Sequence, residues 1–189
     1  MMPEKTVVAQ LEKIHLFRNV DRNDVIRLVK MCEIRHFMPR NVIYPQGAPA
    51  ENAMILVSGK LDVNIVTGST ERHLGDIHPG EIFGEQGLFH SGGVRSAQVV
   101  ANKESVCLLI TPELMRDTWN NQAIVALEQY LIATMARRIR TTNLEIQKIW
   151  KSEEKKEETP EKTTNTVVET PTENSGGLLG RLRSLFGGK

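Results

Sequence analysis

Hydrophobic and polar residues follow different patterns in successive parts of the chain, and each pattern predicts a different kind of element. Residues 4–18 and 22–33 have the pattern of two helices, with Asp21 as a plausible N-cap for the second. From about 34 to 110, short apolar runs of Val, Ile and Leu are separated by turn residues rich in Gly, Pro and Ser. Short strands with frequent turn signals indicate a compact antiparallel β-roll or barrel.

A long helical pattern follows the strands. Thr111 and Pro112 predict a helix start, with threonine as the cap and proline at the first helical position. One long helix is then expected over about 121–150. A heptad seam runs along this helix at positions separated alternately by three and four residues: Val125, Glu128, Ile132, Met135, Ile139, Thr142, Ile146 and Ile149. Its two polar members are Glu128 and Thr142. Packing against the roll would also give apolar periodicity, but the seam persists to the end of the helix. This favours a two-helix dimer interface.

The character of the chain changes after Trp150. Residues 151–175 are mostly Glu, Lys, Thr and Pro and cannot bury enough surface to fold, so a disordered linker is expected. In residues 176–189, a helix would place its apolar side chains on one face and its basic ones on the other. The apolar set is Leu178, Leu179, Leu182, Leu185 and Phe186, and the polar set is Arg181, Ser184 and, toward its edge, Arg183.

Because an isolated helix this short is only marginally stable in water, this amphipathic tail should fold only against a surface. A basic amphipathic segment suits an anionic membrane surface. Two alternatives remain: the tail docks in the groove of a partner protein, or it has no role.

Composition narrows the class of protein. The 189 residues allow one domain with appendages, and a formal charge of +1 gives no general attraction to nucleic acid. The N-terminus, with Glu4 and Glu12, is not a signal peptide, and no apolar run is long enough to span a membrane. Cys32 and Cys107 each lie inside an apolar stretch, which predicts buried free thiols and suits a reducing cytoplasm.

Residues that could carry catalysis or bind a metal form no recognisable set. The histidines at positions 15, 36, 73, 78 and 90 lack metal-ligand spacing, so neither a metal site nor a cofactor is expected. No plausible nucleophile is accompanied by its base. Catalysis is therefore not expected.

The segment 80–97 contains the most informative chemistry. It combines a glycine-rich turn, a carboxylate at Glu85, a short helical start, and Arg95 followed by Ser96. Glycines let the backbone approach a ligand closely, and free N–H groups at a helix start attract phosphate. Arginine makes charge-assisted hydrogen bonds to phosphate oxygens, whereas a carboxylate accepts from a neutral donor such as a ribose hydroxyl. Together these parts predict a pocket for a nucleotide monophosphate.

This segment resembles the phosphate-binding cassette of cyclic nucleotide-binding domains, the family of the bacterial catabolite activator and of protein kinase A regulatory subunits. The resemblance covers about residues 10–150 and includes further glycines and apolar pairs in order: Leu11, Ile14, Leu16, Phe17, Val25, Leu28, Val42, Ile43, Gly47, Ile55, Leu56, Gly59, Leu61, Val63, Leu74 and Gly75. It implies an α+β fold, with an antiparallel, jelly-roll-like β-roll flanked by N-terminal helices and a long C-terminal dimerisation helix. Arg40 or Asn41 replaces a common turn glycine, and Met54 a common aromatic.

The resemblance also implies roles for individual residues. Glu85 would accept from the ribose 2′-hydroxyl, and Arg95 would pair with the cyclic phosphate. The other expected ligand-binding residues form the phosphate cradle, wall the sugar and base, or close over the adenine: Val63, Leu74, Gly84, Gln86, Ser96, Thr142 and Asn143. Ser96 after the arginine resembles cAMP-responsive members, so cAMP is favoured over cGMP.

Transcription factors of this family have a helix-turn-helix domain after the long helix. The residues after the long helix here do not have that pattern, so DNA binding is not expected. We expect a stand-alone cyclic nucleotide receptor in which ligand repositions the long helix of a homodimer. The tail resembles the membrane-targeting helices of Min-system cell-division ATPases, which implies a cytoplasmic protein attached peripherally to the inner face of the cell membrane, or to a protein partner. The alternative is an interaction scaffold with a degenerate pocket that recruits a partner enzyme.

Overall fold

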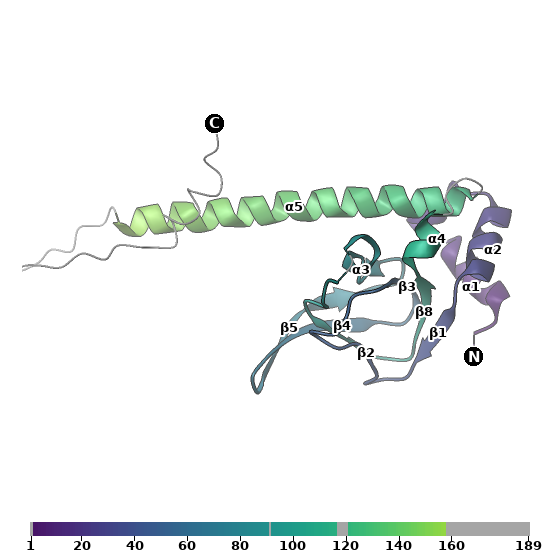
Figure 1. Ribbon diagram of the computed structural model, residues 1–189, viewed down its shortest axis with the longest axis horizontal. Coiled ribbons are helices and arrows are strands. Elements are labelled where there is room, and N and C mark those ends of the chain that lie inside the picture. The colour runs from purple at the N-terminus through teal and green to yellow at the C-terminus, as the bar shows by residue number, and fades with distance from the viewer. Residues whose placement is uncertain (1, 91, 117–120, 158–189) are drawn as a thin grey trace, which may run out of the picture. The chain divides into compact units, whose positions relative to one another are not determined.

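The structure is a computed structural model that describes residues 2–90, 92–116 and 121–157 (Figure 1). Helix α1 (Glu4–Leu11), the 3₁₀ helix η1 (His15–Phe17) and α2 (Arg22–Met31) precede the strands. The strands are β1 (Ile34–Phe37), β2 (Val42–Tyr44), β3 (Ala53–Ser58), β4 (Leu61–Thr67), β5 (Thr70–Ile77), β6 (Ile82–Phe83), β7 (Gln98–Ala101) and β8 (Ser105–Ile110). The remaining helices are α3 (Gln86–Phe89), α4 (Pro112–Arg116) and α5 (Gln122–Glu157).

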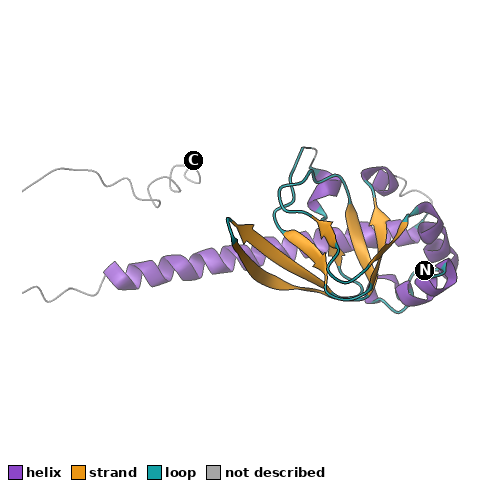
Figure 2. Ribbon diagram, turned by 90° about the horizontal axis from the view of Figure 1, so that it is seen from below, coloured by secondary structure: helices purple, strands orange, loops and turns teal. Residues whose placement is uncertain are grey.

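The strands form two four-stranded sheets in the orders β1-β8-β3-β6 and β2-β7-β4-β5 (Figure 2). Every pairing between neighbouring strands of these sheets is antiparallel. The expected antiparallel β-roll with N-terminal helices and a long C-terminal helix is therefore confirmed.

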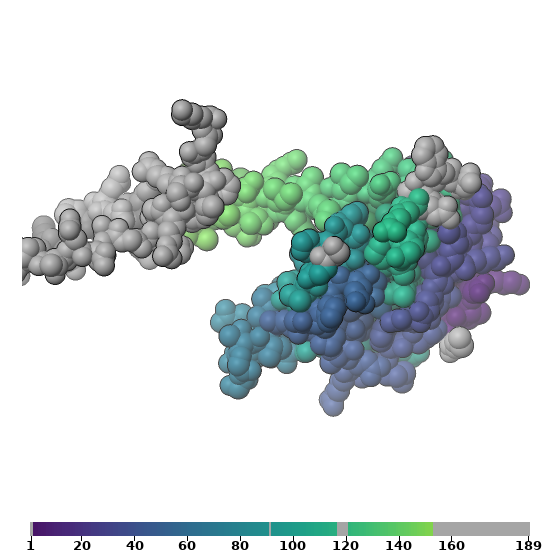
Figure 3. Space-filling model, viewed as in Figure 1, coloured from purple at the N-terminus to yellow at the C-terminus, as the bar shows by residue number. Residues whose placement is uncertain are grey.

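Strands β3 and β8 are buried on both faces, and their alternation explains two separate core clusters. In β3, Ile55 and Val57 belong to a cluster with α1, α2 and the first turns of α5, whereas Met54 and Leu56 point between the two sheets. Strand β8 divides in the same way, with Leu108 on the helical side. The sheet β1-β8-β3-β6 is thus a middle layer between the helices and the second sheet, and the N-terminal helices form one continuous surface with the roll (Figure 3).

The N-terminal helices match the helices expected from the sequence only in part. Asp21 caps α2, since its carboxylate accepts from the Asn23 amide at 2.8 Å. The single helix expected over 4–18 is wrong, because α1 ends at Leu11 and η1 is a separate turn. Hydrogen bonds of the 3₁₀ type, including Ile14 N to Leu11 O at 2.9 Å, tighten the last turn of α1. Ile14 is then extended and packs against the core.

The predicted start of α4 is confirmed, because the Thr111 hydroxyl accepts from the Leu114 amide at 3.3 Å and Pro112 is the first helical residue. The next helix, α5, begins with caps from two elements. The Asn121 side chain accepts from the Ala123 amide at 2.9 Å, and the buried Asp24 of α2 accepts from the Gln122 amide at 3.2 Å.

Helix α5 extends beyond the expected range of 121–150. Residues 151–157, which the sequence analysis assigned to the linker, continue the helix, and their Lys and Glu residues have good helix propensity. The rest of the linker, 158–175, and the amphipathic tail, 176–189, lie outside the described residues. None of the described helices has the length and hydrophobicity needed to cross a membrane.

Two kinds of apolar position alternate along α5. Ala123, Ile124, Leu127 and Leu131 are buried against the core, whereas the seam residues Ile132 and Ile139 are 61% and 63% exposed. Residues up to Leu144 form one compact unit with the roll. Within this unit the roll therefore leaves Ile132 and Ile139 of the seam uncovered, whereas Val125 and Met135 of the seam are half-buried.

Three residues singled out earlier have clear environments. Arg40 has a φ of 70°, the left-handed conformation that favours glycine, which agrees with its place at a turn glycine of the family. Both cysteines are free, with Cys107 buried and Cys32 half-buried, and burial raises the pKa of each thiol to about 12. The buried-thiol expectation is thus confirmed for Cys107 and only partly met by Cys32.

Candidate functional site

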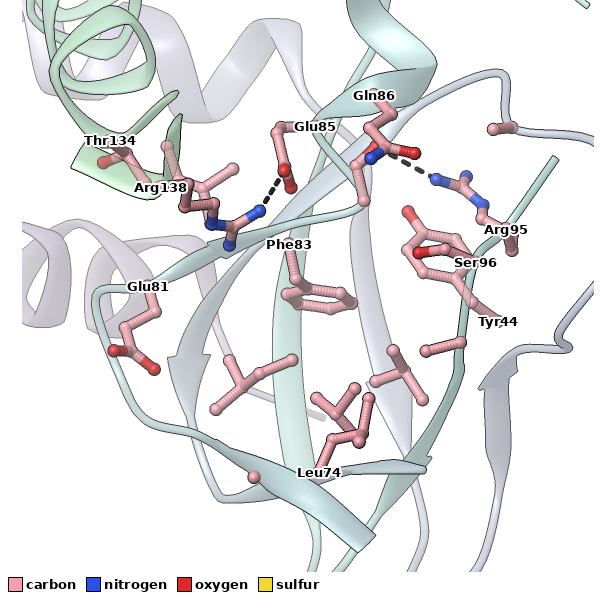
Figure 4. A pocket seen from close by; sticks show the side chains of 18 of the residues that line it. Tyr44, Leu74, Glu81, Phe83, Glu85, Gln86, Arg95, Ser96, Thr134 and Arg138 are labelled. Atoms are coloured by element: carbon pink, nitrogen blue, oxygen red, sulfur yellow. Dashed lines mark hydrogen bonds and ion pairs between the residues drawn. The ribbon is translucent and has the colours of Figure 1, made fainter. Parts of the chain in front are cut away.

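A cavity of about 480 Å³ lies between the β4–β5 hairpin, the β6–α3 loop, the segment before β7, and α5. Its apolar wall includes Val63, Leu74 and Phe83, and its polar groups include Glu85 and Arg95 (Figure 4). Seven of the expected ligand-binding residues line it: Val63, Leu74, Gly84, Glu85, Gln86, Arg95 and Ser96. The cassette and the hairpin are thus brought to one cavity.

Arg95 is held in a fixed orientation although it is charged and only 7% exposed. Its Nη1 donates to Gly84 O at 3.0 Å and its Nη2 donates to Asn52 Oδ1 at 3.1 Å. The guanidinium also lies over the Tyr44 ring, with its carbon 3.6 Å from the ring centroid. A guanidinium has more N–H donors than these two acceptors use, so it can still bind an anion in the cavity.

Tyr44 and Asn52 support this arrangement from β2 and the loop before β3. The Tyr44 hydroxyl donates to Asn52 Oδ1 at 2.6 Å, so one amide oxygen orients both the phenol and the guanidinium. Burial raises the pKa of the Tyr44 hydroxyl to about 12, which keeps the ring neutral beneath the guanidinium. Sequence reasoning missed both residues, since no local pattern connects them to the cassette.

The cassette glycines are needed for close packing. Gly84 has a φ of +72°, and an added Cβ would lie 2.6 Å from Arg95 Nη1 and 2.7 Å from Tyr44 Cε2. At Gly87, a Cβ would lie 2.7 Å from the backbone N and O of Asn52. Larger residues would therefore push the Glu85–Gln86 turn away from the groups that orient Arg95.

Glu85 sits at the N-cap position of α3 and is 7% exposed. Its carboxylate is bound by the guanidinium of Arg138, which comes from α5 and has a side chain 58% exposed (Figure 4). The amides of Gly87 and Leu88 donate to Gly84 O and Glu85 O, both at 3.0 Å, whereas those of Glu85 and Gln86 have no partner among the described residues, as is usual for the first N–H groups of a helix. The turn thus presents a carboxylate and amide donors side by side.

Helix α5 contributes Tyr130, Thr134, Arg137 and Arg138 to the cavity wall. Thr142 and Asn143, which the resemblance implies close over the adenine, are both exposed and do not line the cavity of the single chain. Whether they contact a ligand stays a prediction. A usable signal existed: the buried stripe through Leu127 and Leu131 continues at the same spacing to Thr134 and Arg138, where it turns polar.

The cavity can therefore hold a molecule with an anionic and a hydroxylated end. Arg95 supplies a buried cation, Glu85 supplies an acceptor, and apolar side chains lie between and beside them. The seven tail residues proposed for membrane or partner binding, Leu178, Leu179, Arg181, Leu182, Arg183, Leu185 and Phe186, lie outside the described residues.

Comparison with known proteins agrees with this geometry. The family model for the cyclic nucleotide-binding domain matches residues 34–122. The potassium channel KAT2 of Oryza sativa subsp. japonica is 35% identical over 81 residues, which cover 43% of this chain and 14% of the channel. The crystal structure of the Thermus thermophilus catabolite activator protein is similar with a TM-score of 0.60 and 28% identity, over 71% of this chain and 62% of that one.

A third similarity is confined to the fold. The regulatory subunit of a cAMP-independent protein kinase A from Trypanosoma brucei has a TM-score of 0.57 and 20% identity, over 69% of this chain and 46% of that one. The chain spans between 9% and 50% of the length of the curated relatives that it matches. The shared part is thus one module of longer proteins.

Proposed function

Because residues 34–122 belong to the cyclic nucleotide-binding domain family, we propose that the cavity binds a cyclic nucleotide and that the protein is a receptor for it. The observation that supports this most is the placement of Arg95 and Glu85 on one cavity wall, both buried and directed by other residues. Their charges match the two ends of a cyclic ribose phosphate.

The proposed pose follows from the donors and acceptors available. Arg95 pairs with the cyclic phosphate, and the Ser96 hydroxyl and the amides of Glu85 and Gln86 complete the anion site. Glu85 accepts from the ribose 2′-hydroxyl, while Val63 and Leu74 contact the sugar and base. We favour cAMP over cGMP because serine follows the arginine, as in cAMP-responsive members of the family.

The contact between Glu85 and Arg138 gives this proposal a route to a response. A ribose hydroxyl that donates to Glu85 replaces or displaces a donor that comes from α5. Ligand occupancy is therefore coupled to the position of α5. Thr142 lies one turn beyond Arg138, so a shift of α5 would bring Thr142 and Asn143 toward the base.

Calorimetric titration of the protein with cAMP and cGMP tests the binding. We expect heat with cAMP and weaker binding of cGMP. Arg95→Ala should lower the affinity by at least about 30-fold, because truncating a buried charge partner costs about 2–5 kcal/mol. Arg35→Ala, which removes an arginine from an exposed ion pair with Glu33, is the matched control. Absence of heat with either nucleotide in the parent protein would remove the receptor proposal.

We also propose that the seam of α5 forms a homodimer. Ile132 and Ile139 are large apolar residues that the roll does not cover, and they repeat with heptad spacing. Ile139→Glu should convert the dimer to a monomer in sedimentation analysis, because it places a charge in the seam. Arg140→Glu, a charge change at the next position and off the seam, should leave the dimer intact. A parent protein that sediments as a monomer would contradict the dimer.

The third part of the proposal concerns the amphipathic tail, which we expect to attach the protein to an anionic membrane surface. Single short amphipathic elements bind weakly, and two tethered tails in a dimer bind more strongly. Sedimentation with anionic liposomes should carry the parent protein down and lose it when Leu182 and Phe186 are changed to Glu. Ser184→Glu adds charge on the polar face and should weaken binding less. Unchanged sedimentation of the double variant would favour a protein partner.

A scaffold with a degenerate pocket is the second candidate, and one observation favours it. Arg95 and Glu85 each have protein partners without any ligand, namely Gly84, Asn52 and Arg138. The same fold also occurs in a kinase regulatory subunit described as cAMP-independent. Native mass spectrometry separates the candidates, because a receptor purified from cells should carry nucleotide and a scaffold should not.

A further inference from the structure

A β-bulge in the β4–β5 hairpin brings three chemically active side chains together. In the register, Asp62 pairs with Asp76, Val63 with Gly75, and Asn64 with His73, so Leu74 has no partner. Residues three apart in a regular strand point to opposite faces, but the extra residue places His73 on the face of Asp76. Asp62 lies on the same outer face, because its neighbours Leu61 and Val63 pack inward.

The ligand atoms of these three residues are close enough to share one ion. One carboxylate oxygen from each aspartate and one ring nitrogen of His73 all lie within 4.8 Å of one another. His73 Nε2 is 3.3 Å from Asp76 Oδ1. Two carboxylates and an imidazole are a donor set that suits divalent transition metals such as Zn²⁺.

Hydrogen bonds outside the cluster fix the tautomer of His73. The Glu71 carboxylate can only accept, so Asn64 must present its Nδ2 to it, as the distance of 2.6 Å indicates. Asn64 Oδ1 then faces His73 Nδ1 at 3.1 Å, and Nδ1 must carry the proton. The other ring nitrogen, Nε2, faces Asp76 Oδ1, so it is the nitrogen that a metal ion held between the two residues would bind.

The two aspartates also have partners that leave oxygen lone pairs free. Lys60 Nζ is 2.7 Å from Asp76 Oδ2, and the opposite oxygen, Oδ1, faces His73. Asn102 Nδ2 is 2.8 Å from Asp62 Oδ2 and 3.2 Å from Oδ1. Polar neighbours that orient each ligand are typical of metal sites. Lys60 supplies a competing positive charge, so the affinity should be lower than that of a purely acidic site.

We propose that Asp62, His73 and Asp76 form a site for a divalent transition metal, with His73 binding through Nε2. Linear spacing of the histidines had excluded a metal, and the bulge supplies what the spacing lacks. The site is independent of the proposed nucleotide binding, although Leu74, Gly75 and Asp76 also line the cavity. A bound ion therefore sits on the hairpin that forms one cavity wall.

Calorimetric titration of the untagged full chain with zinc chloride tests the site, with magnesium chloride as a comparison. We expect zinc binding, and no comparable binding of Mg²⁺, which prefers oxygen ligands. His73→Gln and Asp76→Asn should each lower zinc affinity by at least about tenfold. His78→Gln removes an exposed histidine two residues beyond Asp76 and should leave the affinity unchanged. Zinc affinity that is equal in the parent and in His73→Gln would overturn the site.

Nitrogen NMR of the imidazole provides a second test that does not depend on variants. Zinc should shift the Nε2 resonance of His73 strongly and leave Nδ1 protonated, because Nδ1 donates to Asn64. A shift at Nδ1, or no shift at either nitrogen, would contradict the proposed ligand set. Thermal unfolding of His73→Gln without metal should match the parent, since the residue is exposed.

Discussion

The two polar walls of the cavity differ in how firmly they are held. On the cassette wall, Arg95 is 7% exposed and contacts Gly84, Asn52 and Tyr44, which belong to three different segments. On the helix wall, the Arg138 side chain is 58% exposed and forms an ion pair with Glu85. One wall is built before any ligand arrives, and the other is joined to it by a contact that a ligand can replace.

This difference assigns separate tasks to the two walls. A preorganised cation needs little rearrangement to bind a phosphate, so the cassette should provide most of the affinity. An exposed partner such as Arg138 contributes little to stability, and its loss from Glu85 is offset when another donor replaces it. The helix wall should therefore provide the response rather than the affinity.

The largest expected effect comes from disturbing the cassette wall. Gly84→Ala places a Cβ 2.6 Å from Arg95 Nη1 in a backbone with a φ of +72°. Left-handed backbone costs about 1–2 kcal/mol for an L-residue, and overpacking adds about 1–3 kcal/mol. Urea unfolding should show this loss, and nucleotide affinity should fall with it.

Gly68→Ala is the matched control for this substitution. Gly68 also has a positive φ, of +60°, but an added Cβ would meet nothing within 4 Å. It should therefore show the backbone cost alone, with unchanged nucleotide affinity. Equal losses of stability in the two variants would mean that the cassette wall tolerates displacement.

The next effect is a pH dependence from Tyr44 on the same wall. Its pKa is raised from 10.0 to about 12, chiefly by burial, so the folded state holds the hydroxyl proton more tightly than the unfolded state does. This stability is fully present below pH 10 and is lost as the pH rises through 12, by about 3 kcal/mol in total. Urea unfolding between pH 9 and pH 12 should show a steeper decline for the parent than for Tyr44→Phe.

A smaller effect on affinity is expected at the helix wall. Arg138→Gln removes the ion pair with Glu85, and the nucleotide affinity should change by less than about fivefold, or about 1 kcal/mol. The ligand-dependent movement of α5 should be lost, as measured by distances between spin labels placed at position 140, off the seam, in the proposed dimer. If affinity fell as far as in Arg95→Ala, the division of tasks between the walls would be wrong.

The smallest effect lies outside both walls. Arg40 has a φ of 70° and Arg40→Gly relieves this conformation, while the greater freedom of glycine in the unfolded chain offsets part of the gain. We expect a net stabilisation of about 0.5 kcal/mol in urea unfolding and no change in nucleotide affinity. A change in affinity would show that the turn before β2 communicates with the cavity.

That the cassette residues meet at one cavity could be predicted from the sequence, because they are neighbours in the chain. Glu85, Gln86, Arg95 and Ser96 lie within one loop-helix-loop segment, and all line the cavity. The pair between Glu85 and Arg138 joins residues 53 positions apart, and only the change of α5's buried stripe from apolar to polar marks its site. Tyr44 and Asn52 had no local signal, since their roles arise from packing of β2 against the loop before β3.

Other differences have local physical causes. No metal site was expected from the sequence, because the histidines lack metal-ligand spacing and a regular strand would place His73 and Asp76 on opposite faces. One unpaired residue, Leu74, reverses that assignment. The N-terminal helix is interrupted before Ile14 because Ile14 packs against the core, a tertiary contact that the local pattern does not show. Helix α5 extends through Glu157 because the Lys and Glu residues that suggested a linker also have good helix propensity.

The anchoring of α5 at its first turn makes the helix a lever. Asn121 and the buried Asp24 hold the amides of Ala123 and Gln122, so that end acts as the fulcrum. Arg138 lies about 24 Å along the axis from it, at 1.5 Å of rise per residue. If a bound molecule pushes Arg138, Ile139 and Thr142 should move at least as far as Arg138 does, because they lie farther from the fulcrum. A change at the cavity would then become a misalignment where two such helices would meet.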